Sequence, residues 1–521
     1  MRRAAKKLWK SESGSVAPIV AISLFALIGA AGIGFDYARM ASLDTELQDA
    51  ADQAALAAAT QLDGKSDSIT RATAAAQNLF ANNARFANDG TSPGIVISGF
   101  TFYLGYDQTT DAYGTATTDP KLAAIVKVTT AGREAFFALT PIVGAIRSGS
   151  LTGSATAGIS QAICKVPPVM ICNPAESATN TDPLADFTAP AGTGLKLVTG
   201  NASAPGNFGW LESNIGNGAS ALAEALGYDS PPGTCSPLNN VTTKTGMNAS
   251  VLSALNTRFD VFANGSSTCP TQDGGTCSPS ANTRKDLACK VTKGACSGTW
   301  EESPKPYRPT SVAALPSNGS ADPDMMGYPR DLCHAVPAGT AGACGITGNG
   351  TWDRDAYFRV NYGYSTASPW TSGTGLSSTV TRYQVYQWEL AHQSVVVNGS
   401  SHGISVPQSA GGDTGYGTPV VAPPGLTPGG ANLDRRRISV AVLNCNALSV
   451  SGKTSNIPVA KWLDVFLVEP SYSRSGGNGS NKVAYTDQKE VYVEVIGTTG
   501  SGVDGTTNSQ IVQRAVPYLI R

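Results

Sequence analysis

Ten cysteines and three histidines are the residues best suited to chemistry in this chain of 521 residues. A zinc site is disfavoured because no CxxC pair occurs and few histidines are present to share a metal. The even number of cysteines instead predicts disulfide bonds, formed in an oxidising compartment. Their connectivity stays open, although two of them, eight residues apart, bracket a short Pro-Pro loop. The candidates are Cys164, Cys172, Cys235, Cys269, Cys277, Cys289, Cys296, Cys333, Cys344 and Cys445.

Two stretches have the outline of a catalytic motif. His334 adjoins Cys333, but a cysteine nucleophile and its histidine normally meet through the fold, so we expect Cys333 to be disulfide-bonded. GSSHG at residues 399–403 matches the GxSxG elbow of hydrolases, which opens a helix and needs a later histidine. ISVPQ follows instead and no histidine comes after His402, which predicts a hairpin turn. We therefore expect no catalytic residue and no enzyme activity.

Metal, phosphate and nucleic-acid chemistry are equally poorly supported. Asp322, Asp324 and Asp331 could offer oxygen ligands to calcium, but the EF-hand spacing is absent. No GxxxxGK[ST] phosphate loop occurs. The net charge of −1, with no basic block beyond the first ten residues, disfavours nucleic acid as a partner. We expect no metal and no cofactor.

Aromatic residues cluster between positions 357 and 388. The alternation in RYQVYQW predicts a strand with Tyr383 and Val385 on one face and Tyr386 and Trp388 on the other. Burial in a β core is the simpler interpretation. An interaction surface is the alternative, because Tyr and Trp are enriched at interfaces.

The elements that must position these residues begin with an apolar segment. Residues 16–35 are 20 uncharged residues, enough for a helix to cross a hydrocarbon core of roughly 30 Å. Five basic residues precede this segment and acidic residues follow it, which places the N-terminus in the cytoplasm. A cleaved signal peptide has a shorter apolar run of about 7–15 residues, so a permanent anchor is favoured. Its candidate residues are Val16, Pro18, Leu24, Leu27, Gly29, Gly32 and Phe35.

Beyond the apolar segment, small and apolar residues recur at helical spacing. This pattern predicts one continuous helix from about Ser15 to Gln61. We expect the resulting face to pack on its own domain or on a neighbouring subunit's helix, with a solvated stalk as the remaining possibility. The face comprises Met40, Leu43, Leu47, Ala50, Ala54 and Ala58.

The predicted fold class is α+β. A single transmembrane helix extends into a long stalk, followed by a small antiparallel α/β module and a disulfide-linked β-rich region. In the module we expect a helix over 69–86, strands over 94–106, 121–131 and 150–164, and a helix containing Phe136, Phe137, Leu139 and Ile142. The expected domains are 1–62, 63–163, 164–430 and 431–521.

Residues 14–59 resemble the N-terminal segment of the TadE/TadG-like proteins of Flp (tight adherence) pilus assembly. The matching features are the GSVAP entry, Asp36-Tyr37 at the exit of the span, and the ADQAALAAA helix. Residues 124–160 resemble the strand–amphipathic helix–strand that follows the anchor in this family. RRRISVAVLNC, WLDVFLVEPS and the closing VQRAVPYLIR resemble the C-terminal part of TadG-related proteins.

The resemblance implies a structural or assembly component, single-pass in the bacterial inner membrane, with a cytoplasmic N-terminus and its bulk in the periplasm. The implied partners are other pilus assembly proteins or pilins, with self-association through the N-terminal helix, and no nucleic acid. The Asp-x-Ser-x-Ser of von Willebrand A metal sites is absent, so metal-dependent adhesion by that route is not implied.

Two alternatives remain open. One is a minor pilin-like subunit cleaved after Gly14, although Ile19 stands where processed prepilins carry Glu. The other is an anchored surface adhesin or carbohydrate-binding protein.

Overall fold

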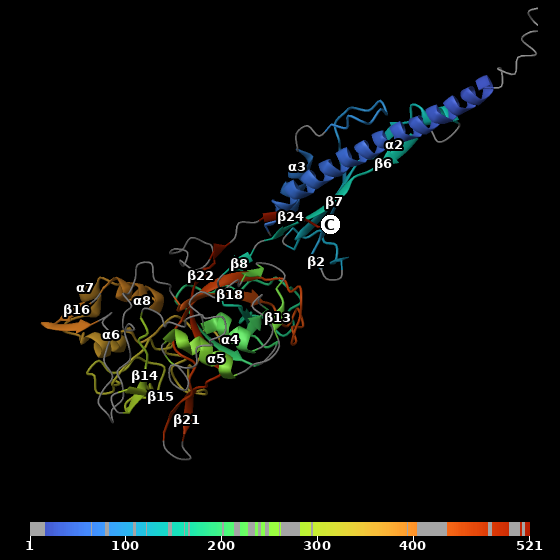
Figure 1. Ribbon diagram of the computed structural model, residues 1–521. Coiled ribbons are helices and arrows are strands. Elements are labelled where there is room, and N and C mark those ends of the chain that lie inside the picture. The colour runs from blue at the N-terminus through green and yellow to red at the C-terminus, as the bar shows by residue number, and fades with distance from the viewer. Residues whose placement is uncertain are drawn as a thin grey trace, which may run out of the picture. The chain divides into compact units, whose positions relative to one another are not determined.

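The chain forms two compact units (Figure 1). Unit 1 comprises Met1–Ser160 with Ala515–Arg521, and unit 2 comprises Gln161–Arg514. The computed structural model describes residues 16–63, 65–78, 83–107, 111–120, 122–143, 148–160, 162–164, 167–200, 203–212, 219–227, 235–237, 241–244, 249–259, 261, 282–292, 295–392, 394–403, 435–477, 482–499, 511–512 and 516–520.

Unit 1 is a long helix seated on an antiparallel sheet. Helix α2 (Val16–Ala59) is continuous over 44 residues, as predicted, because its sequence is rich in Ala and Leu and its proline, Pro18, lies in the first turn, where proline is tolerated. The sheet has the order β1-β4-β7-β24, with β1 Ile97–Tyr103, β4 Ile125–Thr130, β7 Ser154–Ser160 and β24 Val516–Ile520. Three of these strands were predicted, and the fourth arrives from the other end of the chain. Short α3 (Ser68–Gln77) packs beside α2.

The helix predicted around Phe136 is wrong. Residues Arg133–Phe136 form β5, which pairs with β6 (Ser148–Leu151), and the described residues between the two strands include the short 3-10 helix η2 (Thr140–Val143). The physical reason is that the backbone groups in the first half of the expected helix form hydrogen bonds with β6 instead. Local periodicity in the sequence does not reveal this pairing. A second hairpin joins β2 (Tyr106–Asp107) to β3 (Ala112–Tyr113). Helix α3 ends earlier than predicted, and Leu79 and Phe80 lie outside the described residues.

Unit 2 is built on six strands whose hydrogen-bonded pairs close into a barrel. Around the barrel the order is β9 (Val169–Cys172), β11 (Asn207–Leu211), β10 (Gly194–Thr199), β22 (Glu490–Thr498), β19 (Lys461–Leu467) and β18 (Arg437–Leu443). The β9–β18 and β10–β11 pairs are parallel and the other pairs are antiparallel. Alternate residues of β18, Ile438, Val440 and Val442, belong to one buried core. The ring closes where Val198 and Thr199 of β10 pair with Asn207 and Phe208 of β11.

Smaller elements surround the barrel. Helices α4 (Ala219–Gly227) and α5 (Ala249–Asn256) with η3 (Thr257–Phe259) contribute to the same core. The remaining short strands are β8 (Ala162–Cys164), β12 (Cys235–Pro237), β13 (Thr243–Lys244), β20 (Arg474–Gly476), β21 (Val483–Thr486) and β23 (Ile511–Val512).

Residues 282–403 form what we call the aromatic lobe. It contains the hairpins β14–β15 (Leu287–Thr292, Ala295–Glu302) and β16–β17 (Ser394–Val397, Ser400–Gly403), and the helices α6 (Arg354–Tyr362), α7 (Trp370–Thr374) and α8 (Arg382–Ala391). Its core includes Phe466 and Tyr492, which point outward from the barrel strands β19 and β22. Burial of the aromatic residues is therefore confirmed, but this core lies between helices and barrel strands and is not the β core that was expected.

The strand predicted for RYQVYQW is wrong, because these residues lie in helix α8. A capping box starts the helix: the Thr381 side chain accepts the Gln384 N–H, and the Gln384 side chain accepts the Thr381 N–H. Tyr383 and Tyr386, three residues apart, are then both buried on one helix face.

Disulfide bonding is confirmed for four cysteines. Cys172 pairs with Cys445 and Cys333 pairs with Cys344. Cys172 reaches the β18 end of the barrel because Leu443 lies opposite it in the parallel β9–β18 ladder. The side chains of the other six candidates lie outside the described residues: Cys164, Cys235, Cys269, Cys277, Cys289 and Cys296.

Candidate functional site

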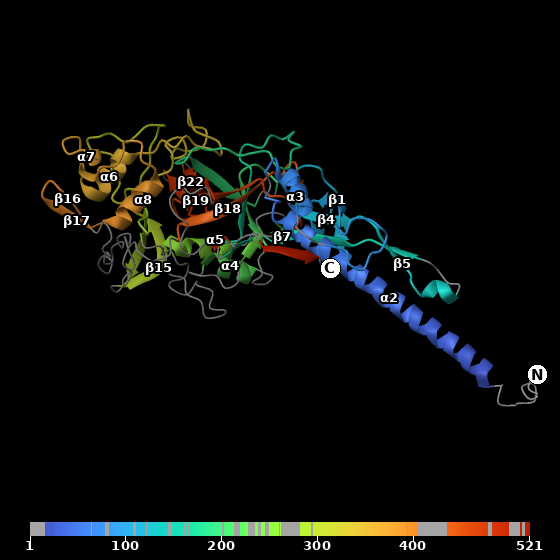
Figure 2. The ribbon, with the colours of Figure 1, turned by 90° about the horizontal axis from the view of Figure 1, so that it is seen from above.

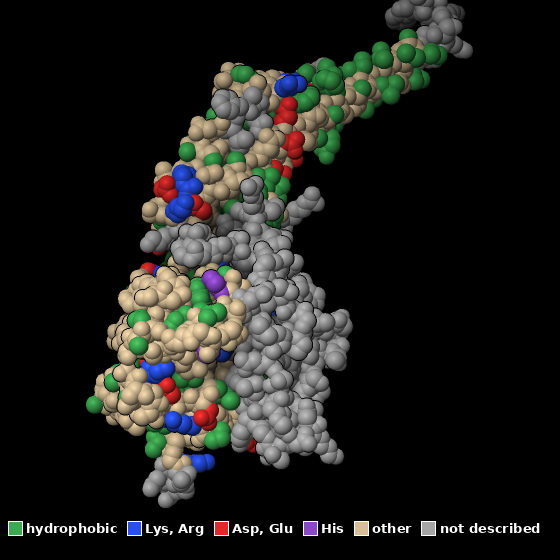
Figure 3. Space-filling view, turned by 90° about the vertical axis from the view of Figure 1, so that its left-hand side faces the viewer, with side chains coloured by type: hydrophobic (Ala, Val, Ile, Leu, Met, Phe, Trp, Pro, Cys, Tyr) green, Lys and Arg blue, Asp and Glu red, His purple; other side chains and the backbone are tan. Residues whose placement is uncertain are grey.

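Helix α2 changes character along its length. In its first part, large apolar side chains are open to the surroundings: 59% of Val16, 54% of Leu24, 67% of Leu27 and 58% of Phe35 is exposed. Figure 3 shows hydrophobic side chains covering this free end of the helix. Among the described residues, α2 is the helix long and apolar enough to cross a membrane.

Two of the predicted anchor glycines have a different environment. Gly29 and Gly32 are buried, whereas Pro18 is exposed like its large apolar neighbours. A Cβ atom added to Gly32 would lie 2.7 Å from Cβ of Leu139. Glycine at this position therefore lets the segment between β5 and β6 approach the helix backbone.

Asp36 fastens that segment to the helix. Its side chain is 2% exposed. Oδ1 accepts the N–H of Ala138 at 2.9 Å, and Oδ2 accepts those of Leu139 at 3.0 Å and Thr140 at 2.7 Å. The Thr140 hydroxyl donates to Oδ2 at 2.8 Å. The carboxylate thus satisfies the backbone donors that lead into η2, as a capping side chain does at a helix start.

The sequence had marked Asp36 only as the exit of the apolar segment. Its partners lie more than 100 residues away, so no local pattern pointed to this role. The useful signal was a single acidic residue directly after an uncharged run of 20 residues.

The second part of α2 lies inside unit 1. The helix's own domain, one of the two partners expected, covers the predicted interaction face. This face comprises Met40, Leu43, Leu47, Ala50, Ala54 and Ala58. Leu43, Leu47 and Ala58 are 0% exposed, and Met40 is half-buried. Ala54 and Ala58 pack on β4, β7 and α3, whereas Leu43 and Leu47 cluster with Ala135 of β5 and Leu151 of β6. The helix can approach the sheet closely because residue 153 is glycine. A Cβ at this position would lie 2.2 Å from the Leu47 carbonyl oxygen.

Polar side chains of α2 add further ties to the same unit. Arg39 Nε donates to the Phe86 carbonyl at 3.0 Å, and Glu46 accepts the Phe86 N–H at 3.2 Å. Gln48 Nε2 donates to the Ser154 carbonyl at 3.0 Å. The helix is therefore bound along its whole second part, and a solvated stalk does not describe it.

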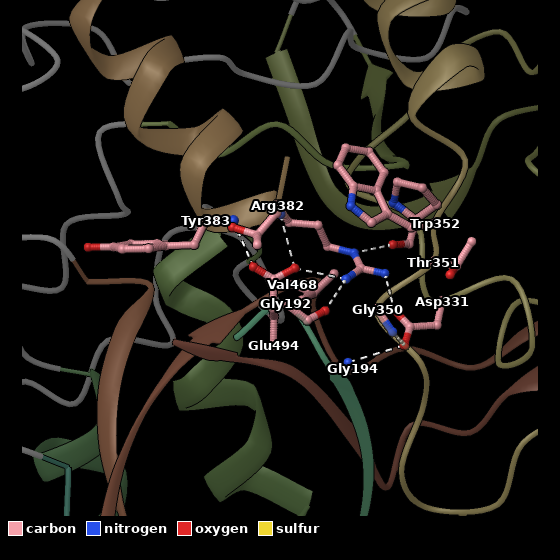
Figure 4. Close-up of polar contacts among 12 residues, drawn as sticks. Gly192, Gly194, Asp331, Gly350, Thr351, Trp352, Arg382, Tyr383, Val468 and Glu494 are labelled. Carbon is pink, nitrogen blue, oxygen red and sulfur yellow. Dashed lines mark hydrogen bonds and ion pairs between the residues drawn. The ribbon is translucent and has the colours of Figure 1, made fainter. Parts of the chain in front are cut away.

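A buried charged cluster lies in unit 2 (Figure 4). Arg382 contacts Glu494 at 2.8 Å and Asp331 at 2.6 Å, and all three side chains are fully buried. Glu494 also accepts the backbone N–H groups of Arg382 and Tyr383, the first of helix α8. The cluster joins the aromatic lobe to barrel strand β22. Arg382 is paired with both carboxylates, and Glu494 also satisfies the first backbone donors of helix α8.

The three aspartates considered for calcium do not meet. Asp331 is engaged by Arg382, and Asp322 accepts Arg359 Nε at 2.7 Å. Asp324 accepts the backbone N–H of Lys305 at 3.2 Å. Each carboxylate is thus committed to a different partner.

The two sequence stretches with catalytic outlines resolve as expected. Cys333 is in a disulfide, so its sulfur is not available as a nucleophile or as a thiolate ligand beside His334. GSSHG belongs to the β16–β17 hairpin, whose turn residues Asn398 and Gly399 both have positive φ. Such an Asn-Gly pair is the preferred two-residue hairpin turn.

A cavity of about 490 Å³ opens in the aromatic lobe beside α6 and α7. Its charged side chains already have partners within the chain. Arg354 Nε donates to a backbone carbonyl at 2.7 Å, Asp355 accepts the Trp370 indole N–H at 2.7 Å, and Arg359 pairs with Asp322. These three lining side chains therefore help to hold the lobe together.

Comparison with known families points to the same part of the chain. A family model described as putative Flp pilus-assembly TadE/G-like matches residues 14–61. The matched range coincides with α2, both its exposed apolar part and the part built into unit 1, and it confirms the resemblance of this segment. Neither the curated proteins nor the solved structures contain a match.

Proposed function

We propose that this chain, whose N-terminal segment is TadE/TadG-like, is a membrane-anchored periplasmic component of a Flp (Tad) pilus system. It acts as a structural or assembly factor in pilus biogenesis and adherence. The observation that carries the proposal is the coincidence of the family match with α2, a helix with an exposed apolar part and a buried part.

Two features support the orientation. Basic residues dominate the ten residues at the start of the chain, which keeps that end on the cytoplasmic side. Two disulfides, Cys172–Cys445 and Cys333–Cys344, lie in unit 2 and suit the oxidising periplasm.

The mechanical consequence is that the anchor and unit 1 are one continuous element. Helix α2 passes from the span into the core of the unit without a break, so movement of the span is transmitted to the sheet. The chain leaves unit 1 after Ser160 and returns at Ala515. Unit 2 is thereby tethered at both ends, and because it holds most of the chain's residues it is the part that we propose contacts pilins or other assembly proteins.

The proposal is tested by deleting the gene and counting surface pili. Loss of pili should be restored by the wild-type chain and not by a variant carrying Leu24→Arg and Leu27→Arg, which charge the exposed apolar part of α2. A matched variant with Leu24→Ile and Leu27→Ile should restore piliation. Normal piliation in the deletion strain would reject an assembly role.

A minor pilin-like subunit is the alternative that the structure favours most, because α2 seated on an antiparallel sheet is a pilin-like plan. Sequencing the N-terminus of the mature protein separates the two. A mature chain that starts at Ser15 would reject the permanent anchor.

A further inference from the structure

Strands β5 and β6 and helix η2 form an arm that lies along α2 (Figure 2). The base of the arm is polar: Arg133 Nε contacts Asp89 at 2.8 Å, in a largely buried ion pair. Its tip lies against the exposed apolar part of α2, where Leu139 packs on Gly32 and Asp36 binds the backbone. The arm thus runs from the folded body of unit 1 to the level of the proposed membrane surface.

The tip has the composition of a membrane-surface segment. Residues 135–143 read AFFALTPIV and carry no charge, and the charged Glu134 precedes them. Phe136 is 45% exposed, and it is among the large apolar side chains that unit 1 leaves uncovered. Aromatic and apolar residues in such a position bind the boundary between headgroups and acyl chains.

The depth of the tip follows from its contact with the helix. Gly32 precedes Phe35, the last residue of the apolar span, by three positions, or about 4.5 Å along the helix axis. Because Leu139 contacts Gly32, it lies on the membrane side of Phe35, the last residue of the span.

The hydrogen bonding of the tip also suits immersion. Backbone donors that enter the edge of a bilayer must be satisfied within the protein. The N–H groups of Ala138, Leu139 and Thr140 all donate to the Asp36 carboxylate. These hydrogen bonds to Asp36 therefore offset the free-energy cost of removing the three backbone N–H groups from water.

We propose that the tip of the β5–β6 arm inserts into the outer boundary of the same membrane that α2 crosses. The inference rests on the proposed membrane anchor and adds a second contact with lipid. Two contacts, the helix and the arm, fix the rotation of unit 1 about the helix axis, which a single span leaves free. The occupant of the exposed Phe136 face is the boundary between the headgroups and the acyl chains of the bilayer, because the tip is continuous with the exposed apolar part of α2.

The test uses the full chain in bacterial membranes with p-benzoylphenylalanine at one site at a time. Phe136 is the test position and Phe25, 55% exposed in α2, is the control for the anchor. Tyr113 in β3, 43% exposed and beside Thr156 of β7, matches Phe136 in exposure but lies away from the arm. After irradiation, lipid adducts and protein cross-links are identified by mass spectrometry. Hydrogen exchange of the sheet strands verifies that each variant is folded.

We expect lipid adducts at Phe25 and Phe136, each at least about fivefold above those at Tyr113. Adducts at Phe25 without adducts at Phe136 would overturn the arm contact and leave the anchor standing. Cross-links from Phe136 to another protein in place of lipid would also overturn it. Absence of lipid adducts at Phe25 would reject the anchor itself, and equal labelling at Tyr113 would remove the support for insertion.

Discussion

The carboxylate of Asp36 and the backbone N–H of Thr140 lie 2.7 Å apart, although the residues are 104 positions apart in the chain. This hydrogen bond joins the exit of the apolar helix to the tip of the β5–β6 arm. It gives the Asp of the Asp36-Tyr37 pair, part of the segment matched by the family model, a physical role within unit 1.

Replacement of this carboxylate should loosen the arm. In Asp36→Ala the four donors of residues 138–140 lose their acceptor, and we expect unit 1 to lose about 1–3 kcal/mol of unfolding free energy. Amide hydrogen exchange at residues 138–140 in the detergent-solubilised protein measures the effect. Asp44→Ala changes an exposed acid on the same helix and should leave that exchange unaltered. Equal exchange in the two variants would contradict the role of Asp36 as the acceptor that holds residues 138–140 in place.

The contact between α2 and the sheet should tolerate no added methyl group at Gly153. A Cβ there would lie 2.2 Å from the Leu47 carbonyl oxygen, so Gly153→Ala must separate helix and sheet. We expect a loss of about 1–3 kcal/mol, typical of overpacking. At Gly132 the nearest atom would be 3.5 Å away, an ordinary contact, so Gly132→Ala is the matched control. Thermal unfolding of the two variants gives the comparison, and similar melting temperatures would show that the helix is not seated as described.

Local patterns in the sequence predicted the elements that are stabilised locally. Helix α2 has a continuous helical periodicity, and β4 and β7 have β-branched or alternating residues. The wrong predictions concern segments whose secondary structure depends on pairing with residues far away in the chain. Residues Arg133–Phe136 are strand because they pair with Ser148–Leu151, and β24 joins unit 1 across more than 350 residues. The sequence predicts a strand where helix α8 forms, because alternating aromatic residues fit both a strand and a core helix that is buried on two sides.

The two described disulfides should differ in their contribution to stability. Cys172–Cys445 closes a separation of 273 residues, and Cys333–Cys344 closes one of 11. In the chain-entropy view, the longer loop stabilises by about 5 kcal/mol and the shorter by about 3 kcal/mol. Paired Cys→Ser variants of each bond, unfolded by denaturant, should show this order. Mass spectrometry of non-reduced peptides checks the pairing, and a Cys164–Cys172 peptide would contradict it.

Arg382 should be indispensable for the packing of the aromatic lobe on the barrel. Arg382→Met leaves Asp331 and Glu494 buried without their cation, which costs about 3–5 kcal/mol. Lys453→Met breaks an exposed pair with Glu212 and should cost less than about 1 kcal/mol. Denaturant unfolding of unit 2 measures both. The double variant Arg382→Met with Glu494→Gln should recover part of the loss, and a purely additive result would contradict direct coupling of the two side chains.

The stability of unit 2 should fall as the pH is lowered from about 6.5 to about 4, partly through His334. Burial lowers the pKa of His334 to about 4, against the opposing attraction of Asp331. Its geometry fits the neutral ring, because Nδ1 lies 3.0 Å from the Tyr492 hydroxyl and Nε2 lies 2.9 Å from the Gly345 carbonyl oxygen.

The sign follows from proton binding. The unfolded histidine, with a pKa of about 6.5, takes up a proton that the folded one refuses, so the unfolding free energy decreases as the pH falls. The full effect at pH 4 is up to about 3 kcal/mol, and it vanishes above the unfolded pKa. His334→Gln should flatten the pH dependence between pH 4 and 6.5, whereas His392→Gln, which alters an exposed histidine, should retain it. Denaturation midpoints at pH 4, 5.5 and 7 provide the measurement, and an unchanged slope in His334→Gln would show that His334 is not the group that titrates.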